Sequence, residues 1–209
     1  LVVLRNGEKV LDAPATGENL DERRIAYHMT GLEIDESGYE FQPQQDQQPL
    51  ITVDRLTLPG AFQDVSFSMQ PGEILGITGL LGSGRSELAD ALFGVRPAQS
   101  GTIAMDGKPV RINSIQDAIH HDIGYVPEDR LTQGLFLEQS ISNNVVVRVV
   151  QETLNSLGLI NNQARQQQVD TWVDDLRIKT NNPELPVNSL SGGNQQRVVL
   201  AKWLADNPR

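Results

Sequence analysis

The alternation of apolar and polar positions divides the chain into a short first part and a longer second part. Residues 1–4 and 9–11 are predicted to be short strands on either side of Asn6-Gly7, a dipeptide typical of a two-residue hairpin turn. Residues 18–29 follow with helical spacing, and Gly31 favours a helix stop there. The first part is therefore predicted to contain a hairpin followed by a helix.

A polar segment, residues 35–49, separates the two parts. Its sequence, DESGYEFQPQQDQQP, is rich in glutamine and nearly free of aliphatic side chains. Such a segment buries too little apolar surface to offset the entropy lost on ordering. We therefore predict three regions, which are a first unit at residues 1–34, a linker at 35–49 and a second unit at 50–209.

From residue 50 onward, short apolar runs alternate with helical stretches, which is the pattern of an α/β fold. Residues 73–78 (EILGIT) form a nearly continuous apolar run, typical of a strand that is buried on both faces. The other expected strands are residues 51–58, 65–69, 102–105, 110–112 and 123–126. Helices are expected at residues 86–93, 114–121 and 195–205, and residues 141–176 are expected to be mainly helical.

The amino-acid composition argues against several classes of function. There are 17 Lys and Arg against 27 Asp and Glu, a formal net charge of −10, which argues against binding to a nucleic-acid backbone. The chain has no cysteine, which excludes disulfides and thiolate chemistry and fits the cytoplasm. No apolar run approaches the roughly 20 residues that span a bilayer. The first residues lack a start Met and the pattern of a signal peptide, so we expect the chain to come from the middle of a longer protein.

The sharpest local motif is GLLGSGRS, residues 79–86, between an expected strand and an expected helix. It fits the phosphate-loop pattern GxxxxGK[ST] with arginine in place of lysine. The glycines let backbone N–H groups surround a phosphate, and the helix N-terminus adds partial positive charge. A glycine-rich turn that only packs a strand on a helix is the alternative, but the spacing and context favour a nucleotide phosphate. The expected nucleotide-binding residues are Gly79, Gly82, Ser83, Gly84, Arg85, Ser86 and Glu87.

Two residues of this loop have particular chemistry. The Ser86 hydroxyl is the natural ligand for a magnesium ion that accompanies the nucleotide. Arg85 keeps the positive charge of the usual lysine, but its wide planar fork fits poorly where a compact ammonium inserts. We therefore expect nucleotide to bind and the chemical step at this loop to be slow.

A second motif, LSGGNQQR at residues 190–197, stands just before another expected helix. Ser191 can cap that helix, and Gly192 and Gly193 leave backbone N–H groups open at its positive end. Taken alone, the motif is an ordinary capped helix start.

Together the two motifs resemble the ABC ATPases, whose signature LSGGQ takes the form LSGGNQQ in the second nucleotide-binding domain of carbohydrate importers. The resemblance covers residues 50–209. The segment GYVPEDR, residues 124–130, matches the Q-loop region, with Glu128 where most of the family has glutamine. The sugar-importer second domain has this glutamate and the arginine at position 85, so both departures favour that subfamily. Residues 1–34 resemble the end of a first ABC domain.

The resemblance implies a P-loop NTPase fold with a small antiparallel β subdomain and a helical subdomain. It implies ATP and Mg²⁺ as cofactors, with Glu128 at the Q-loop position. The family continues after the signature helix into the Walker B strand, which this chain does not reach, so the chain alone should not hydrolyse ATP. The signature residues expected to act on the site of a partner domain are Ser191, Gly192, Gly193 and Gln195.

The implied partners are another ABC nucleotide-binding domain, transmembrane permease subunits and, indirectly, a periplasmic or extracellular solute-binding protein. No nucleic acid is expected. The implied location is the cytoplasmic face of the inner (plasma) membrane, as a peripheral protein.

Two alternative functions stay open at this point. One is a regulatory nucleotide-binding module, with which Arg85 is compatible. The other is a non-transport ABC ATPase acting on nucleic acid or ribosomes, against which the acidic composition counts. Residues 141–176 could dock a membrane subunit, or their apolar face could be ordinary core.

Overall fold

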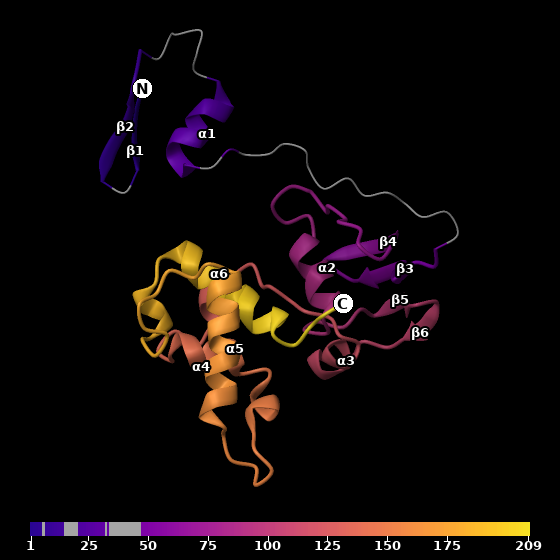
Figure 1. Ribbon diagram of the computed structural model, residues 1–209. Coiled ribbons are helices and arrows are strands. Elements are labelled where there is room, and N and C mark those ends of the chain that lie inside the picture. The colour runs from indigo at the N-terminus through magenta and orange to yellow at the C-terminus, as the bar shows by residue number, and fades with distance from the viewer. Residues whose placement is uncertain (6, 15–20, 32, 34–46) are drawn as a thin grey trace. The chain divides into compact units, whose positions relative to one another are not determined.

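The computed structural model describes residues 1–5, 7–14, 21–31, 33 and 47–209 (Figure 1). The chain divides into two compact units, Leu1–Gln45 and Asp46–Arg209. Most of the expected linker, residues 35–46, lies outside the described residues.

The first unit contains the expected hairpin and helix. Strands β1 (Val2–Arg5) and β2 (Glu8–Asp12) pair antiparallel, and Asn6 between them lies outside the described residues. Helix α1 (Glu22–Thr30) begins at Asp21, whose carboxylate accepts a hydrogen bond from the Arg24 backbone N–H at 2.8 Å. It ends at Gly31, in the left-handed region at φ 76°, so the predicted stop is confirmed. The start falls later than residue 18, and residues 15–20 are not described.

The second unit contains a four-stranded antiparallel sheet with strand order β4-β3-β5-β6. Two helices accompany it, and Ser114 caps the second through its hydroxyl, as predicted. A sheet-side core joins these elements, built from Val53, Leu56, Leu88, Phe93, Ile103, Ile112 and Ala118. The elements are β3 (Ile51–Leu58), β4 (Phe62–Met69), α2 (Arg85–Leu92), β5 (Ser100–Met105), β6 (Lys108–Val110) and α3 (Ile115–His120).

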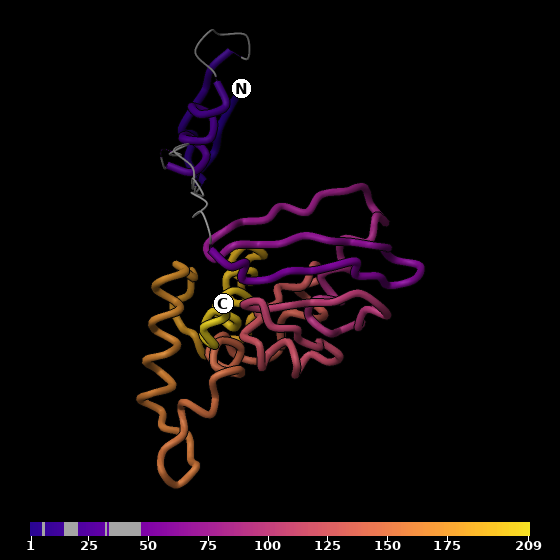
Figure 2. The backbone as a smooth tube through the Cα atoms, turned by 90° about the vertical axis from the view of Figure 1, so that its right-hand side faces the viewer, coloured from indigo at the N-terminus to yellow at the C-terminus, as the bar shows by residue number. Residues whose placement is uncertain are grey.

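The remaining helices of the second unit pack around a core of their own. Figure 2 shows the course of the backbone through this part of the chain. The expected helical stretch at residues 141–176 is interrupted, because residues 154–160 form a turn closed by a bridge between Leu154 and Ile160. This helical core contains Ile141, Val145, Val149, Val169, Val187, Val198 and Val199, so the apolar face of α4 and α5 is ordinary core. The elements are η1 (Arg130–Gly134, a π-helical turn), α4 (Ile141–Val146), η2 (Val150–Thr153), α5 (Asn162–Asp175), η3 (Val187–Ser189) and α6 (Gly192–Leu204).

Trp203, near the end of α6, packs against both cores. Its ring meets the buried Phe93 ring edge-on, with centroids 5.3 Å apart. The Arg148 guanidinium lies 4.2 Å from the Trp203 ring centroid and pairs with Asp206. Next to it, the buried Lys202 ammonium donates to the carbonyl of Gly134 at 2.5 Å. The C-terminal half of α6 therefore joins the helical core to the sheet-side core.

Two predicted strands, residues 73–78 and 123–126, are not formed. A strand needs a neighbour that pairs with its backbone groups. Among the described residues, no backbone hydrogen bond links residues 74–82 to another segment, and Ile74 is 76% exposed. Every described strand pairing is antiparallel, and these two segments take part in none of them. No helix in the described part of the chain has the length and apolar character needed to cross a bilayer.

Candidate functional site

The phosphate-loop motif forms a glycine-shaped turn that leads directly into α2. Gly82 and Gly84 have φ angles of 78° and 89°, in the region that glycine adopts without steric cost. A Cβ at Gly84 would lie 2.4 Å from the carbonyl oxygen of Ala61, so this position accepts only glycine. At Gly82 a Cβ would meet no atom within 4 Å. The loop therefore turns at two left-handed glycines, and the space beside Gly82 is open.

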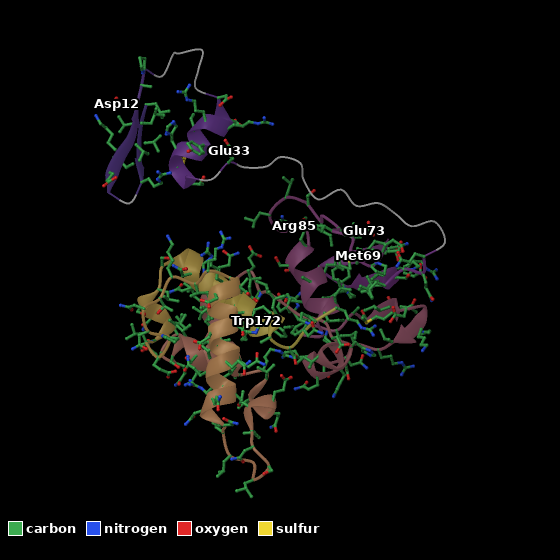
Figure 3. All side chains as sticks on the ribbon, in the orientation of Figure 1. Asp12, Glu33, Met69, Glu73, Arg85 and Trp172 are labelled. Atoms are coloured by element: carbon green, nitrogen blue, oxygen red, sulfur yellow. The ribbon has the colours of Figure 1, made fainter. Side chains whose placement is uncertain are left out.

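The cation of the motif stands at the start of α2. Figure 3 shows Arg85 at this N-terminal end of the helix. The Arg85 side chain is exposed and makes no hydrogen bond or ion pair within the described part of the chain. Glu87, in the first turn of the same helix, is half-buried. Arg85 is therefore available to an anion that binds at the loop.

A pocket of about 360 Å³ adjoins the loop and brings distant parts of the sequence together. The central contact joins the Ser86 hydroxyl, which donates, to a Glu128 carboxylate oxygen at 2.6 Å. The residues that line the pocket are Ile77, Arg85, Ser86, Ala89, Leu92, Tyr125, Val126 and Glu128.

The Ser86 and Glu128 oxygens fit a magnesium ion that binds together with a nucleotide. Mg²⁺ prefers oxygen ligands and usually takes one or two from protein side chains, with phosphates and water completing the octahedron. The described residues contain no group of three or more His, Asp and Glu that could hold a metal alone. The pair therefore suits a metal whose other ligands come from a bound phosphate.

The structure adds two residues that the motifs did not indicate. The Tyr125 hydroxyl donates to Asp90 at 2.8 Å, and the Tyr125 ring stacks on Phe93 with centroids 4.8 Å apart. Burial, followed by the hydrogen bond to Asp90, raises the pKa of Tyr125 to about 12. The one available signal was spacing, because Asp90 lies four residues after Ser86 and shares its face of α2.

The signature motif opens α6, but its serine does not cap the helix as predicted. Ser191 occupies the N-cap position, yet its side chain bonds no backbone N–H of the helix. Its hydroxyl instead accepts a hydrogen bond from the Asn194 amide at 3.0 Å, because that side chain reaches it one turn along. A Cβ at Gly193 would meet no atom within 4 Å, whereas one at Gly192 would lie 2.8 Å from the Arg130 guanidinium. The first N–H groups of α6 are thus open beside a cationic side chain.

Gln195 has a structural contact in this chain. The side chain is buried, and its amide donates to the Leu190 carbonyl at 3.1 Å, which fixes the turn before α6. Within the described structure no hydrogen bond or ion pair joins residues 79–87 to residues 190–197. The chain therefore presents two separate groups of open backbone N–H donors, one at the start of α2 and one at the start of α6.

Comparison with known proteins finds sugar-import ATP-binding proteins among the relatives. The ribose import ATP-binding protein RbsA of Geobacillus kaustophilus is 43% identical over 207 residues, which cover 99% of this chain and 41% of that protein. A putative ribose/galactose/methyl galactoside import ATP-binding protein of Rhizobium meliloti is 45% identical over 160 residues, 77% of this chain and 31% of that protein. The chain thus spans less than half the length of these curated relatives.

Solved structures share the fold at lower identity. One is cbiO1 from Clostridium perfringens, part of the ABC transporter complex cbiONQ, with a TM-score of 0.60, 23% identity, and coverage of 78% of this chain and 63% of that one. Another is a bacterial Atm1-family ABC exporter with ATP bound, with a TM-score of 0.58 and 20% identity. The match covers 83% of this chain and 31% of that one. The family described as ABC transporter matches residues 62–209, well over half of the sequence. The chain therefore belongs to the ABC transporter family.

Proposed function

We propose that the second unit binds ATP with Mg²⁺ and is the ATP-binding part of a sugar-type importer whose ATP hydrolysis drives uptake. The observation that carries this proposal is the combination at the start of α2. A loop with two left-handed glycines leads into a pocket that is lined by Arg85, which has no partner among the described residues, and by the Ser86–Glu128 contact. The relatives named for ribose and galactose import support the substrate class.

Each group has a distinct task in this proposal. Backbone N–H groups of residues 79–86 donate to the phosphate oxygens, a contribution of roughly 0.3–2 kcal/mol at a helix N-terminus. Because that is modest, Arg85 must add charge, and Ser86 and Glu128 would hold the magnesium ion. The bound metal would neutralise charge that develops on the phosphates during transfer. Gly79, Gly82, Ser83, Gly84 and Glu87 complete the proposed nucleotide contacts.

The start of α6 has a different partner in this proposal. Ser191, Gly192 and Gly193 would contact the nucleotide of another ABC domain, while Gln195 supports their backbone from inside. The open N–H groups beside Arg130 and the lack of any bond to residues 79–87 favour such an arrangement.

We assign the surroundings by the same proposal. Residues 1–34 would be the tail of a preceding ABC domain, 35–49 a linker, and 50–209 a second domain up to its Walker B strand. The assembly would include transmembrane permease subunits and, indirectly, a solute-binding protein. The chain would then lie at the cytoplasmic face of the membrane as a peripheral component.

The test is ATP binding by calorimetry in the complete protein that contains this chain, with a matched pair at Gly82. Both Gly82→Asn and Gly82→Asp fit the open space, and both residues tolerate a left-handed φ better than other side chains do. The two variants differ only in that the aspartate side chain carries a negative charge, which repels phosphate. We expect Gly82→Asn to keep most of the binding at this site and Gly82→Asp to remove it. Equal binding by the two variants would show that the loop contacts no phosphate.

A further inference from the structure

Glu128 lies in a segment that has no strand or helix to hold it. Residues 123–128 carry no regular secondary structure, and no backbone hydrogen bond connects residues 124–128 to another segment of the described chain. The contact between Glu128 and Ser86 is nevertheless short, at 2.6 Å. Side chains must therefore fix this segment against α2.

Two such contacts follow one face of α2. Ser86 and Asp90 are one helical turn apart, so their side chains project on the same side. Ser86 contacts Glu128, and Asp90 accepts the hydrogen bond from Tyr125 at 2.8 Å. The Tyr125 side chain is fixed in the contact with Asp90, because its ring stacks on Phe93, which is only 4% exposed.

The backbone around Asp90 is also fixed. Its carbonyl accepts hydrogen bonds from the backbone N–H groups of Val95 and Arg96 at 2.9 Å and 3.3 Å. Within the described chain Tyr125 is the side chain that bonds to its carboxylate. The hydroxyl–carboxylate bond is of the charge-assisted kind, which is stronger than a neutral one.

We propose that Asp90 and Tyr125 form a positioning pair that holds Glu128 beside Ser86 and thereby sets the affinity of the phosphate site for magnesium. This rests on the proposed function, since it assigns the metal to Ser86 and Glu128. Tyr125 lines the pocket beside the loop, but in this arrangement the metal is assigned to Ser86 and Glu128 alone. Its effect passes through the two residues between Tyr125 and Glu128, one of which is the buried Pro127.

The experiment measures ATP binding in the complete protein, once with saturating Mg²⁺ and once with excess EDTA. Tyr125→Phe keeps the ring on Phe93 and removes only the hydroxyl, so the fold should persist. We expect about 10- to 100-fold weaker binding with Mg²⁺, the order of one lost hydrogen bond to a charged group, and no change in EDTA. Asp90→Asn retains an acceptor oxygen for the Tyr125 hydroxyl and should lose much less.

A double-mutant cycle shows whether the pair acts through Glu128. In a Glu128→Ala background, Tyr125→Phe should have no further effect, because coupled residues are not additive. A Tyr125→Phe loss that is equal in EDTA, that persists in the Glu128→Ala background, or that is absent altogether would overturn the positioning role.

A further measurement separates failure of this inference from failure of the proposed function. At about pH 11 an ordinary tyrosine is mostly ionised, whereas Tyr125 bonded to Asp90 should stay protonated in the ultraviolet difference spectrum against Tyr125→Phe. A wild-type protein that binds no ATP overturns both proposals even if this spectrum shows the pair intact. A protein that binds ATP while Tyr125 ionises normally overturns the pair alone.

Discussion

Replacing the buried Asn144 should weaken the support beneath the signature motif. Asn144 is fully buried in α4, and its side-chain oxygen accepts from the Phe136 N–H at 2.8 Å. Its amide nitrogen donates to the carbonyls of Phe136 and Ser140, each at 3.0 Å. The loop held in this way accepts backbone hydrogen bonds from Val187 and Asn188 at 3.0 Å and 3.1 Å, immediately before the signature.

The magnitude follows from the partner and the volume that Asn144→Ala removes. The Phe136 N–H loses its acceptor, which costs about 1–1.5 kcal/mol, whereas the Phe136 C=O keeps the hydrogen bond from the Gln139 N–H at 2.9 Å. The cavity left by the fully buried amide adds about 1 kcal/mol. The better helix propensity of alanine returns about 0.5 kcal/mol. The net loss is about 2 kcal/mol, which lowers the melting temperature of a domain of this size by roughly 4–8 °C.

The neighbouring Asn143 provides the matched control. It lies in the same helix, so its replacement by alanine brings the same gain in helix propensity. Its side chain is exposed and forms hydrogen bonds with Gln139 and Arg165 at 3.3 Å and 3.0 Å. Asn143→Ala should change stability by no more than about 0.5 kcal/mol. Thermal unfolding of the two variants, with amide exchange at Phe136, is the assay. Equal melting temperatures, or an unchanged Phe136 amide in Asn144→Ala, would refute the reasoning.

Two further predictions concern α6 and the division of labour between the motifs. Burial, and then the charge of Arg148, lower the pKa of Lys202, so its charged form penalises the folded state. This penalty is complete below the lowered pKa and vanishes above the ordinary value of 10.5, so the stability of wild type relative to Lys202→Met should rise from about pH 7 to about pH 10. Denaturation midpoints at both pH values check this, and a constant difference would contradict it. If the start of α6 contacts the nucleotide of another domain, Ser191→Arg should lower steady-state ATP hydrolysis by the complete protein about 10²- to 10³-fold. Arg85→Ala should lower the same rate much less. Equal losses would mean that the two positions act at equivalent sites.

Features that depend on a few neighbouring residues were predictable from the sequence. The helix stop at Gly31, the cap at Ser114 and the glycine loop at residues 79–86 each need only three to eight residues, and the structure contains all three. The helix that follows the signature was also predictable. Ser191 shows the limit of such reasoning, because the Asn194 side chain competes for the hydroxyl that was expected to cap the helix.

Features that depend on distant partners could not be predicted in the same way. Residues 73–78 have the composition of a buried strand, but a strand forms only where another backbone pairs with it. The contact of Asp90 with Tyr125 joins residues 35 positions apart, so only the fold brings them together. The sequence therefore indicated Ser86 and Glu128 separately, and only the fold shows that they are in contact.

The position of Trp203 between the two cores makes it a natural optical reporter. The chain has two tryptophans, and Trp172 packs against the helical core alone. Trp203 meets Phe93 on one side and a guanidinium on its face, so its emission should respond when the helical elements shift against the sheet. A Trp172→Phe variant would leave Trp203 as the single tryptophan of this sequence, which can be excited selectively at wavelengths where tyrosine does not absorb. Nucleotide-driven rearrangement within the second unit could then be followed in solution without attaching any label.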